Sequence, residues 1–429
     1  FQGNPNYLRD RVTETLGLLY AVHWPFYQYE TARNVRMSPF HEHMSEQGAC
    51  FGETSGWERP NWFAPKGTEP KYEYSFSKHN WFDYSAAEHN AVRQNIGLFD
   101  QTSFAKFRFE GRDAERELNR VCSNNIAVEP GRIVYTQWLN GRGGIEADLT
   151  VTRLSYDVFF IVTSGSSQVR DFNWLKCQVS SDAHCILTDV TSSMAVLGLH
   201  GPNTRSFLQS LTHEDMSNEA FPFGTSREID LGYAFVRASR ISYMGELGWE
   251  LYIPTEFSLS VYNKIVEVGV ENDLKYAGAH AMNSLRIEKA YRHWGHDITD
   301  KETPLEAGLE FAVDWNKSQS FIGRDALIRQ KEEGIKRCLV QFLLEDKEKF
   351  LYHNEPIYRD DEITGYVTSA MYGHTLGGAV ALGYLENDLG ISVDFINTGT
   401  YEIEVAGQKI KARASLRPMY DPGNKRKKA

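Results

Sequence analysis

The chain has 429 residues, of which 41% are hydrophobic and 13% aromatic, enough to build two or three domains with sizeable cores. Its formal net charge of -11 at pH 7 argues against nucleic acid as the main partner. No run of about 18 apolar residues occurs, so the sequence predicts no membrane span.

Residues 1–66 are rich in Pro, Trp and Tyr and contain short helical pieces such as residues 10–20. We expect an arm that packs on the body of the protein. Aromatic side chains at this density either bury against the chain or form an interface, and interfaces are enriched in them. The arm is therefore predicted to dock a partner through aromatic residues that include Trp24, Phe26, Tyr27, Trp57, Trp62 and Phe63.

Helical and strand patterns alternate through residues 67–330. Amphipathic helices are predicted at residues 86–96 and 114–121, each followed by strand signals, and the alternation continues through residues 203–211 and 258–272. Alternation of this kind, interspersed with β-hairpins, predicts an α+β domain built from antiparallel sheets.

A glycine-rich reversal at Gly141, Gly143 and Gly144 leads directly into an apolar strand that begins near Asp148. Side chains of a strand alternate between a core face and an open face. A charged side chain at the start of an apolar strand is unusual and requires a structural or functional explanation. A lone aspartate near glycines most often accepts backbone hydrogen bonds only. A functional role for Asp148 is therefore favoured only if motifs elsewhere in the chain support it.

Two further segments carry ionisable groups. Residues 240–254 are predicted as a strand, a glycine-punctuated reversal and a second strand, with Tyr243, Glu246 and Glu250 along them. Glu246 falls within the reversal, where a solvated side chain is expected. Residues 281–292 are predicted as a helix.

From about residue 331 the sequence shows strands alone, predicted at residues 336–344, 363–372, 378–384, 400–405 and 408–415. We expect a small C-terminal β-barrel domain over residues 331–429. The basic residues 425–428 near its end are interpreted as a solvated tail.

The five cysteines are odd in number and form no Cys-x-x-Cys pair: Cys50, Cys122, Cys177, Cys185 and Cys338. This usage suits reduced, buried thiols in a bacterial cytoplasm or a mitochondrial matrix. Two histidine pairs, His41 with His43 and His293 with His296, have no third ligand at helical spacing. No metal site is therefore predicted.

Several motifs follow one another in a definite order: Tyr135-Thr136, Leu139-Asn140, Gly-Gly-Ile-x-x-Asp-Leu at residues 143–149, Tyr-x-Gly-Glu-x-Gly-x-Glu at 243–250, Ser-Leu-Arg-x-Glu at 284–288 and Phe321-Ile322-Gly323-Arg324. This order resembles the glycine-cleavage T-protein (aminomethyltransferase) superfamily. The resemblance implies a folate-binding fold of antiparallel sheets with helices, a small C-terminal β-barrel, and tetrahydrofolate as the cofactor.

The N-terminal part carries a second set of motifs: Tyr7-Leu8-Arg9-Asp10-Arg11-Val12, His23-Trp24-Pro25 and Gly56-Trp57-Glu58-Arg59-Pro60-Asn61-Trp62-Phe63. This set is most similar to the folate-binding half of dimethylglycine and sarcosine dehydrogenases and oxidases, in which a flavin-binding half comes first. No Gly-x-Gly-x-x-Gly turn between a strand and a helix occurs in this sequence. FAD is therefore expected only on a missing domain or a partner chain, and the chain is expected to be a fragment or one subunit of a two-part enzyme.

The resemblance also implies roles for individual residues. Asp148 would be the acidic residue at the reacting centre of tetrahydrofolate. The predicted cofactor-binding residues are Tyr135 and Thr150 in the folate pocket, Tyr243 and Glu250 on the pterin, Arg286 on the folate tail, and Glu246. The family has two successive acids before the leucine, and the first of them is Ala147 here.

Physical chemistry supports the same assignments. A pterin edge presents a ring nitrogen and an exocyclic amine that a carboxylate such as Glu250 satisfies, while tyrosine rings pack on its faces. Transfer of one carbon to tetrahydrofolate passes through a cationic iminium, which a buried Asp148 stabilises. Proton transfer to such a carboxylate is worth on the order of 100- to 10,000-fold in rate.

We therefore predict tetrahydrofolate-dependent one-carbon transfer, which captures a formaldehyde-level carbon from dimethylglycine or sarcosine as 5,10-methylenetetrahydrofolate. The expected partners are a small-molecule substrate and a flavin-containing domain or subunit. One alternative is a direct tetrahydrofolate-dependent demethylase that forms 5-methyltetrahydrofolate. The other is a non-catalytic folate-binding regulatory protein resembling the pyruvate dehydrogenase phosphatase regulatory subunit. The methyl donor stays open, because in this family it is chosen in the flavin half.

Overall fold

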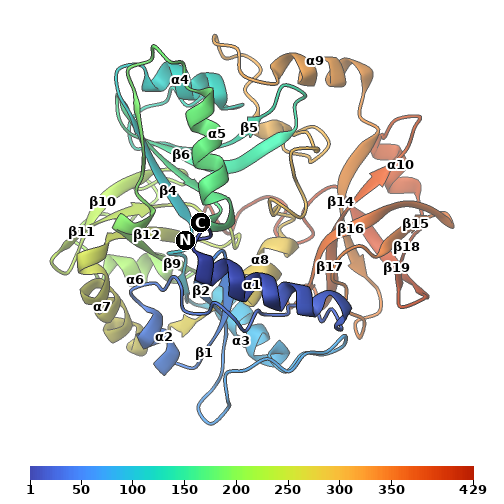
Figure 1. The fold of residues 1–429 in the computed structure, drawn as a ribbon, viewed down its shortest axis with the longest axis horizontal. Helices are drawn as coiled ribbons and strands as arrows, with labels where there is room; N and C mark the ends of the chain where they lie inside the picture. The colour runs from blue at the N-terminus through green and yellow to red at the C-terminus, as the bar shows by residue number, and fades with distance from the viewer.

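The computed structural model of the protein describes residues 1–429. Two β-sheets and a closed barrel form three lobes around the central helix α8, and the helix α1 lies across one side of them (Figure 1). The α+β class with antiparallel sheets and a C-terminal β-barrel, predicted from the sequence, is confirmed. None of the helices combines the length and the apolar character that crossing a membrane requires.

The first lobe contains a five-stranded antiparallel sheet of order β5-β6-β7-β4-β8. Its strands are β4 (Ala105–Glu110), β5 (Ile133–Leu139), β6 (Ile145–Ser155), β7 (Val158–Thr163) and β8 (Ile186–Asp189). One face packs on α4 and α5 through a core that includes Phe107, Leu118 and Trp138. The opposite face points into the middle of the protein.

The second lobe contains a six-stranded sheet of order β10-β11-β12-β9-β3-β13, in which only the β3–β13 pair is parallel. Its strands are β3 (Gly97–Asp100), β9 (Met194–His200), β10 (Ser226–Leu231), β11 (Ala234–Ser239), β12 (Gly248–Pro254) and β13 (Lys275–Tyr276). Leu197, Trp249 and Leu251 on one face join a core with residues of α2, α6 and α7.

The third lobe is a six-stranded barrel of order β14-β17-β16-β15-β18-β19, closed by pairing of β19 with β14. Its strands are β14 (Arg337–Leu344), β15 (Pro356–Arg359), β16 (Glu362–Gly373), β17 (Gly378–Glu386), β18 (Tyr401–Val405) and β19 (Gln408–Ser415). A separate hairpin of β1 (Ala49–Thr54) and β2 (Trp57–Phe63) lies near α8 and α3.

Ten α-helices complete the fold. They are α1 (Pro5–Gly17), α2 (His41–Glu46), α3 (Phe82–Gln94), α4 (Ala114–Val121), α5 (Gln168–Gln178), α6 (Thr204–Gln209), α7 (Ser258–Glu271), α8 (Ala279–Glu288), α9 (Arg324–Glu333) and α10 (Val393–Thr398). Helix α4 has the bounds expected from its sequence. Glu115 and Glu117 in its first turn and Arg120 in its last turn complement the helix dipole.

Three local predictions are wrong. Residues 240–247 form a connection without regular structure, because the first strand of that hairpin, β11, ends at Ser239. The barrel region is not made of strands alone, since α10 lies between β17 and β18. The cysteines are all reduced, but Cys177 is exposed and Cys185 half-buried.

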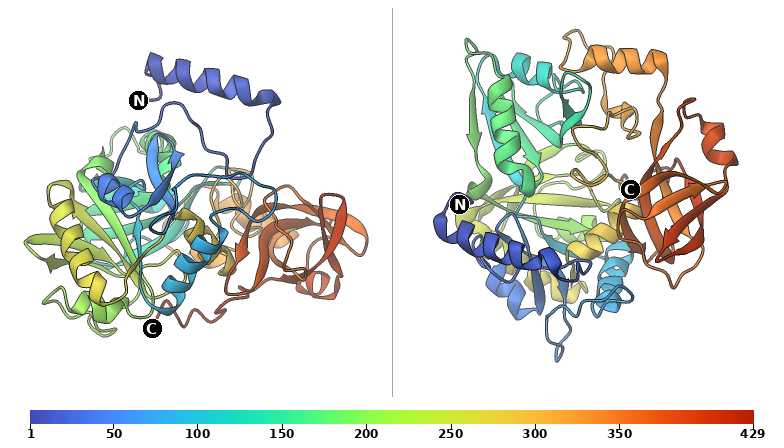
Figure 2. Two further views of the ribbon diagram at one scale, coloured as in Figure 1. Left: turned by 90° about the horizontal axis from the view of Figure 1, so that it is seen from below. Right: turned by 45° about the vertical axis from the view of Figure 1, so that its right-hand side comes forward.

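The arm differs from expectation in which side chains it exposes. None of the six aromatic residues predicted to form a docking surface is exposed: Trp62 is fully buried, and Phe26 packs edge-on against Trp81 at a ring separation of 5.3 Å. Helix α1 instead stands away from the body and has no buried residue (Figure 2). Its exposed apolar side chains are Leu8, Val12 and Leu16.

Candidate functional site

The turn that delivers Asp148 is built from a local hydrogen-bond pattern. The side-chain oxygen of Asn140 accepts from the backbone amides of Arg142 and Gly144 at 2.9 and 3.0 Å. Gly143 has a positive φ of 86°. A Cβ atom on Gly144 would lie 1.9 Å from the carbonyl oxygen of Asp300, so no other residue fits there. Of the three glycines predicted to make the reversal, Gly143 and Gly144 are required by its geometry, whereas a Cβ atom on Gly141 would meet no atom within 4 Å.

The register of strands β5 and β6 brings three of the predicted site residues and Gln137 onto one face of the sheet. Tyr135 pairs with Thr150, and Gln137 pairs with Asp148, across the antiparallel β5–β6 ladder. Directly paired residues point to the same side of a sheet, and residues two apart share a face. Ala147, next to Asp148, points instead into the core on the opposite face. The missing first acid of the family pattern therefore removes no charge from the face that carries Asp148.

Asp148 is held in a largely desolvated environment. The side-chain amide nitrogen of Gln137 donates to its Oδ1 at 2.9 Å. Burial raises the pKa of Asp148 to about 6, against the hydrogen bond from Gln137, the neighbouring hydroxyl of Tyr135 and the charge of Arg292, which lower it. Oδ2 accepts no hydrogen bond from the chain, which leaves this oxygen available for a ligand or a proton.

Arg292 is a cation without a carboxylate partner. Its guanidinium donates to three backbone carbonyls, including those of Ala290 at 2.7 Å and Ala307 at 2.8 Å. Its charge lowers the pKa of both Asp148 and Tyr135. Sequence reasoning singled out neither Arg292 nor Gln137, because nothing in their local sequence shows that they reach Asp148.

Glu250 lies on the inward face of the second sheet. It is buried on β12 opposite Gly198 of β9, and its Oε2 accepts a hydrogen bond from the hydroxyl of Tyr252 at 2.6 Å. Burial raises the pKa of Glu250, while Tyr252 and the ammonium of Lys106 on β4 lower it. Its second oxygen has no hydrogen-bond partner in the chain.

The inward faces of the two sheets meet. Phe160 of β7 packs against Val196 of β9 and Tyr252 of β12, with the rings of Phe160 and Tyr252 5.2 Å apart. Phe160 and Thr152 are paired across β6 and β7, on the face that also carries Thr150 and Asp148. The carboxylates of Asp148 and Glu250 therefore belong to one interior region between the sheets.

Tyr243 approaches the same region from the connection before β12. Its hydroxyl donates to the carbonyl of Arg292 at 3.0 Å, and its ring stacks on Tyr291 at a separation of 6.1 Å. Burial raises the pKa of Tyr243 to about 12, and the negative charge of Asp148 contributes to the rise. Tyr135, Thr150, Asp148 and Tyr243 are thus brought together.

Arg286 is not free to receive a ligand. It is 1% exposed, and each of its three nitrogens donates within the chain. Its partners include Asp297 at 2.8 Å and Ser369 of β16 at 3.0 Å. The expected contact with a folate tail is not supported by this geometry, because the charge already joins α8 to the barrel.

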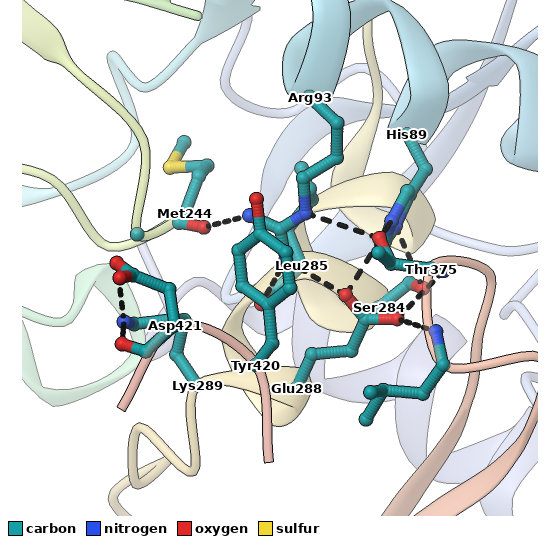
Figure 3. A network of polar contacts seen from close by, with 12 residues as sticks. His89, Arg93, Met244, Ser284, Leu285, Glu288, Lys289, Thr375, Tyr420 and Asp421 are labelled. Carbon is teal, nitrogen blue, oxygen red and sulfur yellow. Dashed lines mark hydrogen bonds and ion pairs between the residues drawn. The ribbon is translucent and has the colours of Figure 1, made fainter. Parts of the chain in front are cut away.

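Glu246 is not solvated, contrary to the prediction. It is 1% exposed and accepts from Arg93 at 2.9 Å, from the hydroxyl of Tyr420 at 2.6 Å and from Arg426 at 3.0 Å. Arg93 also binds Glu288 at 2.8 Å, beneath the ring of Tyr420 (Figure 3). Glu246 therefore belongs to a buried ionic network between α3, α8 and the C-terminal segment.

The basic tail takes part in these contacts as well. Arg426 donates to Glu246, and Lys427 donates to the hydroxyl of Tyr291 at 2.8 Å. Burial lowers the pKa of Lys427 to about 8. The interpretation of the tail as solvated is wrong for Lys427, which is half-buried, whereas Lys425, Arg426 and Lys428 are exposed and Arg426 is solvated in spite of its ion pair with Glu246. The error has a physical cause, since the acceptors lie far away in sequence.

The residues present fit a reduced folate. A pterin needs a carboxylate for its donor edge and aromatic rings for its faces. Glu250 has an uncommitted oxygen, and Tyr135 and Tyr243 supply rings beside Asp148. No group of three or more His, Cys, Asp or Glu side chains is arranged to hold a metal ion.

Comparison with known proteins places this geometry in a family. The GCVT N-terminal domain family matches residues 40–317, and the glycine cleavage T-protein C-terminal barrel domain matches residues 337–421. Residues 1–38 match the FAD dependent oxidoreductase central domain.

The relatives among curated proteins include the following three. A 4-methylaminobutanoate oxidase (formaldehyde-forming) of Paenarthrobacter nicotinovorans is 41% identical over 99% of this chain and 51% of its own length. The mitochondrial pyruvate dehydrogenase phosphatase regulatory subunit of Mus musculus is 36% identical over 97% of this chain and 50% of its own length. The mitochondrial sarcosine dehydrogenase of Homo sapiens is 34% identical over 99% of this chain and 50% of its own length. The chain thus spans about half the length of these relatives.

A solved structure shares the fold. The glycine cleavage system aminomethyltransferase T from Bartonella henselae superposes with a TM-score of 0.76, at 24% identity, over 91% of this chain and 99% of that one. The match agrees with the observed antiparallel sheets and the closed barrel. Since the GCVT N-terminal domain family alone covers more than half of the chain, this protein belongs to the glycine cleavage T-protein family.

Proposed function

We propose that this chain transfers a one-carbon unit at the oxidation level of formaldehyde to tetrahydrofolate, forming 5,10-methylenetetrahydrofolate. The observation that carries the proposal is Asp148. It is a desolvated carboxylate that faces the interior between two sheets and has one oxygen without a hydrogen-bond partner. Burying a carboxylate that is not fully hydrogen-bonded costs free energy, and groups whose pKa is strongly shifted by burial cluster at functional sites.

Tetrahydrofolate is proposed to bind between the two sheets. Glu250 accepts hydrogen bonds from the amino-pyrimidine edge, and the rings of Tyr135 and Tyr243 pack against the pterin. Thr150 lines the same face of β6. Glu246 and Arg286 hold the surrounding elements together in this proposal, because their charges are already paired within the chain.

The chain's own residues act on charge and protons. Bound tetrahydrofolate supplies the two nitrogens that take up the carbon. Asp148 faces the positive charge of the incoming iminium and accepts the proton that leaves the 10-nitrogen. The proton of the 5-nitrogen goes to the departing amine, so that the demethylated amine is released and charge is conserved.

The iminium is proposed to come from an N-methylated glycine, such as dimethylglycine or sarcosine, oxidised by a flavin-containing domain or subunit. The match of residues 1–38 to the FAD dependent oxidoreductase central domain supports such a partner. The exposed apolar side chains Leu8, Val12 and Leu16 of α1 supply a surface of the right character. The division into an arm of residues 1–66, a folate-binding unit of 67–330 and a barrel domain of 331–429 is part of this proposal.

The decisive experiment compares wild type with Asp148→Asn. The exchange keeps the shape of the side chain and removes its charge. We expect both proteins to bind tetrahydrofolate in calorimetric titrations, and the variant to lose most of the enzymatic acceleration of the condensation of formaldehyde with tetrahydrofolate. Unchanged acceleration in the variant would remove Asp148 from the reaction. Folate binding without any acceleration in wild type would favour the regulatory alternative, and 5-methyltetrahydrofolate as product would favour the direct demethylase.

A further inference from the structure

Gln137 is the residue of β5 that stands directly opposite Asp148. It is 0% exposed, and its side-chain amide lies on the inward face of the sheet because the two residues are register partners. The amide nitrogen donates to Oδ1 of Asp148 at 2.9 Å, which is an ordinary distance for a hydrogen bond to a carboxylate. The Gln137 side chain donates no other hydrogen bond.

The other end of the same amide is unsatisfied. Oε1 of Gln137 is buried and has no hydrogen-bond partner. A buried acceptor without a partner costs about 1–3 kcal/mol, and an apolar side chain of the same size would avoid that cost. The sheet does not need an amide at this position, since the backbone of β5 is already paired with β6. Asp148 is the one feature of the surroundings that uses it.

We propose that Gln137 is a positioning residue for Asp148: its amide N–H holds Oδ1 so that Oδ2 faces the ligand and takes up the proton, and its amide turns to accept a hydrogen bond when rotation of the protonated carboxyl about its Cβ–Cγ bond brings the O–H to the position of Oδ1. The inference rests on the proposed function of Asp148 as a proton acceptor. It adds Gln137 to the site, and it assigns the Gln137–Asp148 pair two hydrogen-bonded arrangements, one for the ionised and one for the protonated carboxyl group.

An amide suits both states of a carboxyl group. The ionised carboxylate only accepts hydrogen bonds, so it needs the amide N–H. The protonated acid carries an O–H that donates, and it needs the amide oxygen. The two orientations of a glutamine amide occupy nearly the same volume, so rotation exchanges donor for acceptor without repacking the core. Oε1 of Gln137, which has no partner while Asp148 is ionised, accepts the hydrogen bond when Asp148 is protonated.

The charged and titratable groups around Asp148 define the test. Tyr135 faces it from β5, Arg292 from the segment after α8, and Tyr243 from the connection before β12. All three remain when Gln137 alone is changed. The hydrogen bond from Gln137 lowers the pKa of Asp148, so removing it raises that pKa further above the present value of about 6.

The test is the pH profile of the condensation of formaldehyde with tetrahydrofolate in Gln137→Met, which keeps the length of the side chain and removes the amide. A hydrogen bond to a charged group is worth enough to move the acid limb of kcat/KM upward by about one to two pH units. The rate near pH 6.5 is then expected to fall roughly tenfold, while the rate well above the new pKa stays within a few-fold of wild type.

Two further variants guard the interpretation. Gln341→Met removes another buried glutamine, on β14 of the barrel, whose amide nitrogen donates only to the backbone carbonyls of Ile287 and Glu288 on α8. It is expected to lower stability without moving the acid limb. Gln137→Glu places a second carboxyl beside Asp148 and is expected to move the limb further upward, because two neighbouring carboxylates share a proton.

The outcomes separate this inference from the proposed function. An upward shift in both Gln137 variants and none in Gln341→Met supports the positioning role. An unmoved acid limb in Gln137→Met, with folate binding and turnover retained, overturns it and leaves the role of Asp148 intact. If Gln137→Met folds poorly, the pKa of the Asp148 carboxyl is followed by carbon NMR in Gln137→Glu, where an unchanged value overturns the inference. A wild-type chain that does not bind tetrahydrofolate contradicts the proposed function itself.

Discussion

Replacing Asp148 by asparagine is expected to make the ligand-free protein more stable while it abolishes most methylene transfer. Burial raises the pKa of Asp148 from its ordinary value of 3.8 to about 6. The folded protein at neutral pH therefore holds an ionised group that would be more stable in water. Asparagine keeps a hydrogen-bond acceptor for Gln137 and carries no charge.

The size and sign of the effect follow from this shift. A rise from 3.8 to about 6 corresponds to about 3 kcal/mol, at about 1.4 kcal/mol per pH unit. Solvent reaches this half-buried side chain and screens part of the cost, so we expect a gain of about 1–3 kcal/mol in the free energy of unfolding. Between about pH 4 and pH 6 the folded state binds more protons than the unfolded state. The free energy of unfolding of the wild type therefore falls as the pH rises through this window. Above the window, the folded protein keeps the full cost of the ionised Asp148.

Urea unfolding of both ligand-free proteins at about pH 4.5 and about pH 7.5 measures the effect, since other titrating groups cancel in the difference. The stability gain of Asp148→Asn should be small at the lower pH and large at the higher one. Asp171→Asn serves as a control for turnover: it is a buried aspartate whose pKa is also raised to about 6, but it is bound to Thr163 and Arg170. A stability difference for Asp148→Asn that is zero, or equal at both pH values, would refute the reasoning.

Three further predictions concern neighbouring features. Glu250→Ala should weaken tetrahydrofolate binding by about 2–3 kcal/mol in calorimetry, because the pterin donors lose their partner, whereas the exposed Glu228→Ala should bind like wild type. Glu246→Ala should lower the free energy of unfolding by about 3–5 kcal/mol, since it leaves Arg93 partly unpaired in a buried network; a loss below about 0.5 kcal/mol in urea unfolding would contradict this. The purified chain should be colourless and inert toward dimethylglycine and sarcosine with any electron acceptor; stoichiometric bound flavin would contradict it.

The sequence by itself determined the features that depend on neighbours along the chain. Gly141, Gly143 and Gly144 and the alternation after them predicted the hairpin that carries Asp148, and the register of β5 and β6 agrees. The change to strands after residue 331 predicted the closed barrel. The order of motifs predicted the family that the comparison established. These properties are local or collinear, so a single chain of letters carries them.

Only the tertiary structure decided what the side chains do at distances far along the chain. Glu246 looked solvated within a glycine-rich turn, yet Arg93 and Tyr420 reach it from opposite ends of the sequence. Arg286 matched a ligand-binding motif, yet its charge is paired with Asp297. Gln137 carried no sequence signal, because its role depends on the register that sets it across from Asp148. Burial and ion pairing are properties of the packed interior, and residues distant in sequence supply the partners there.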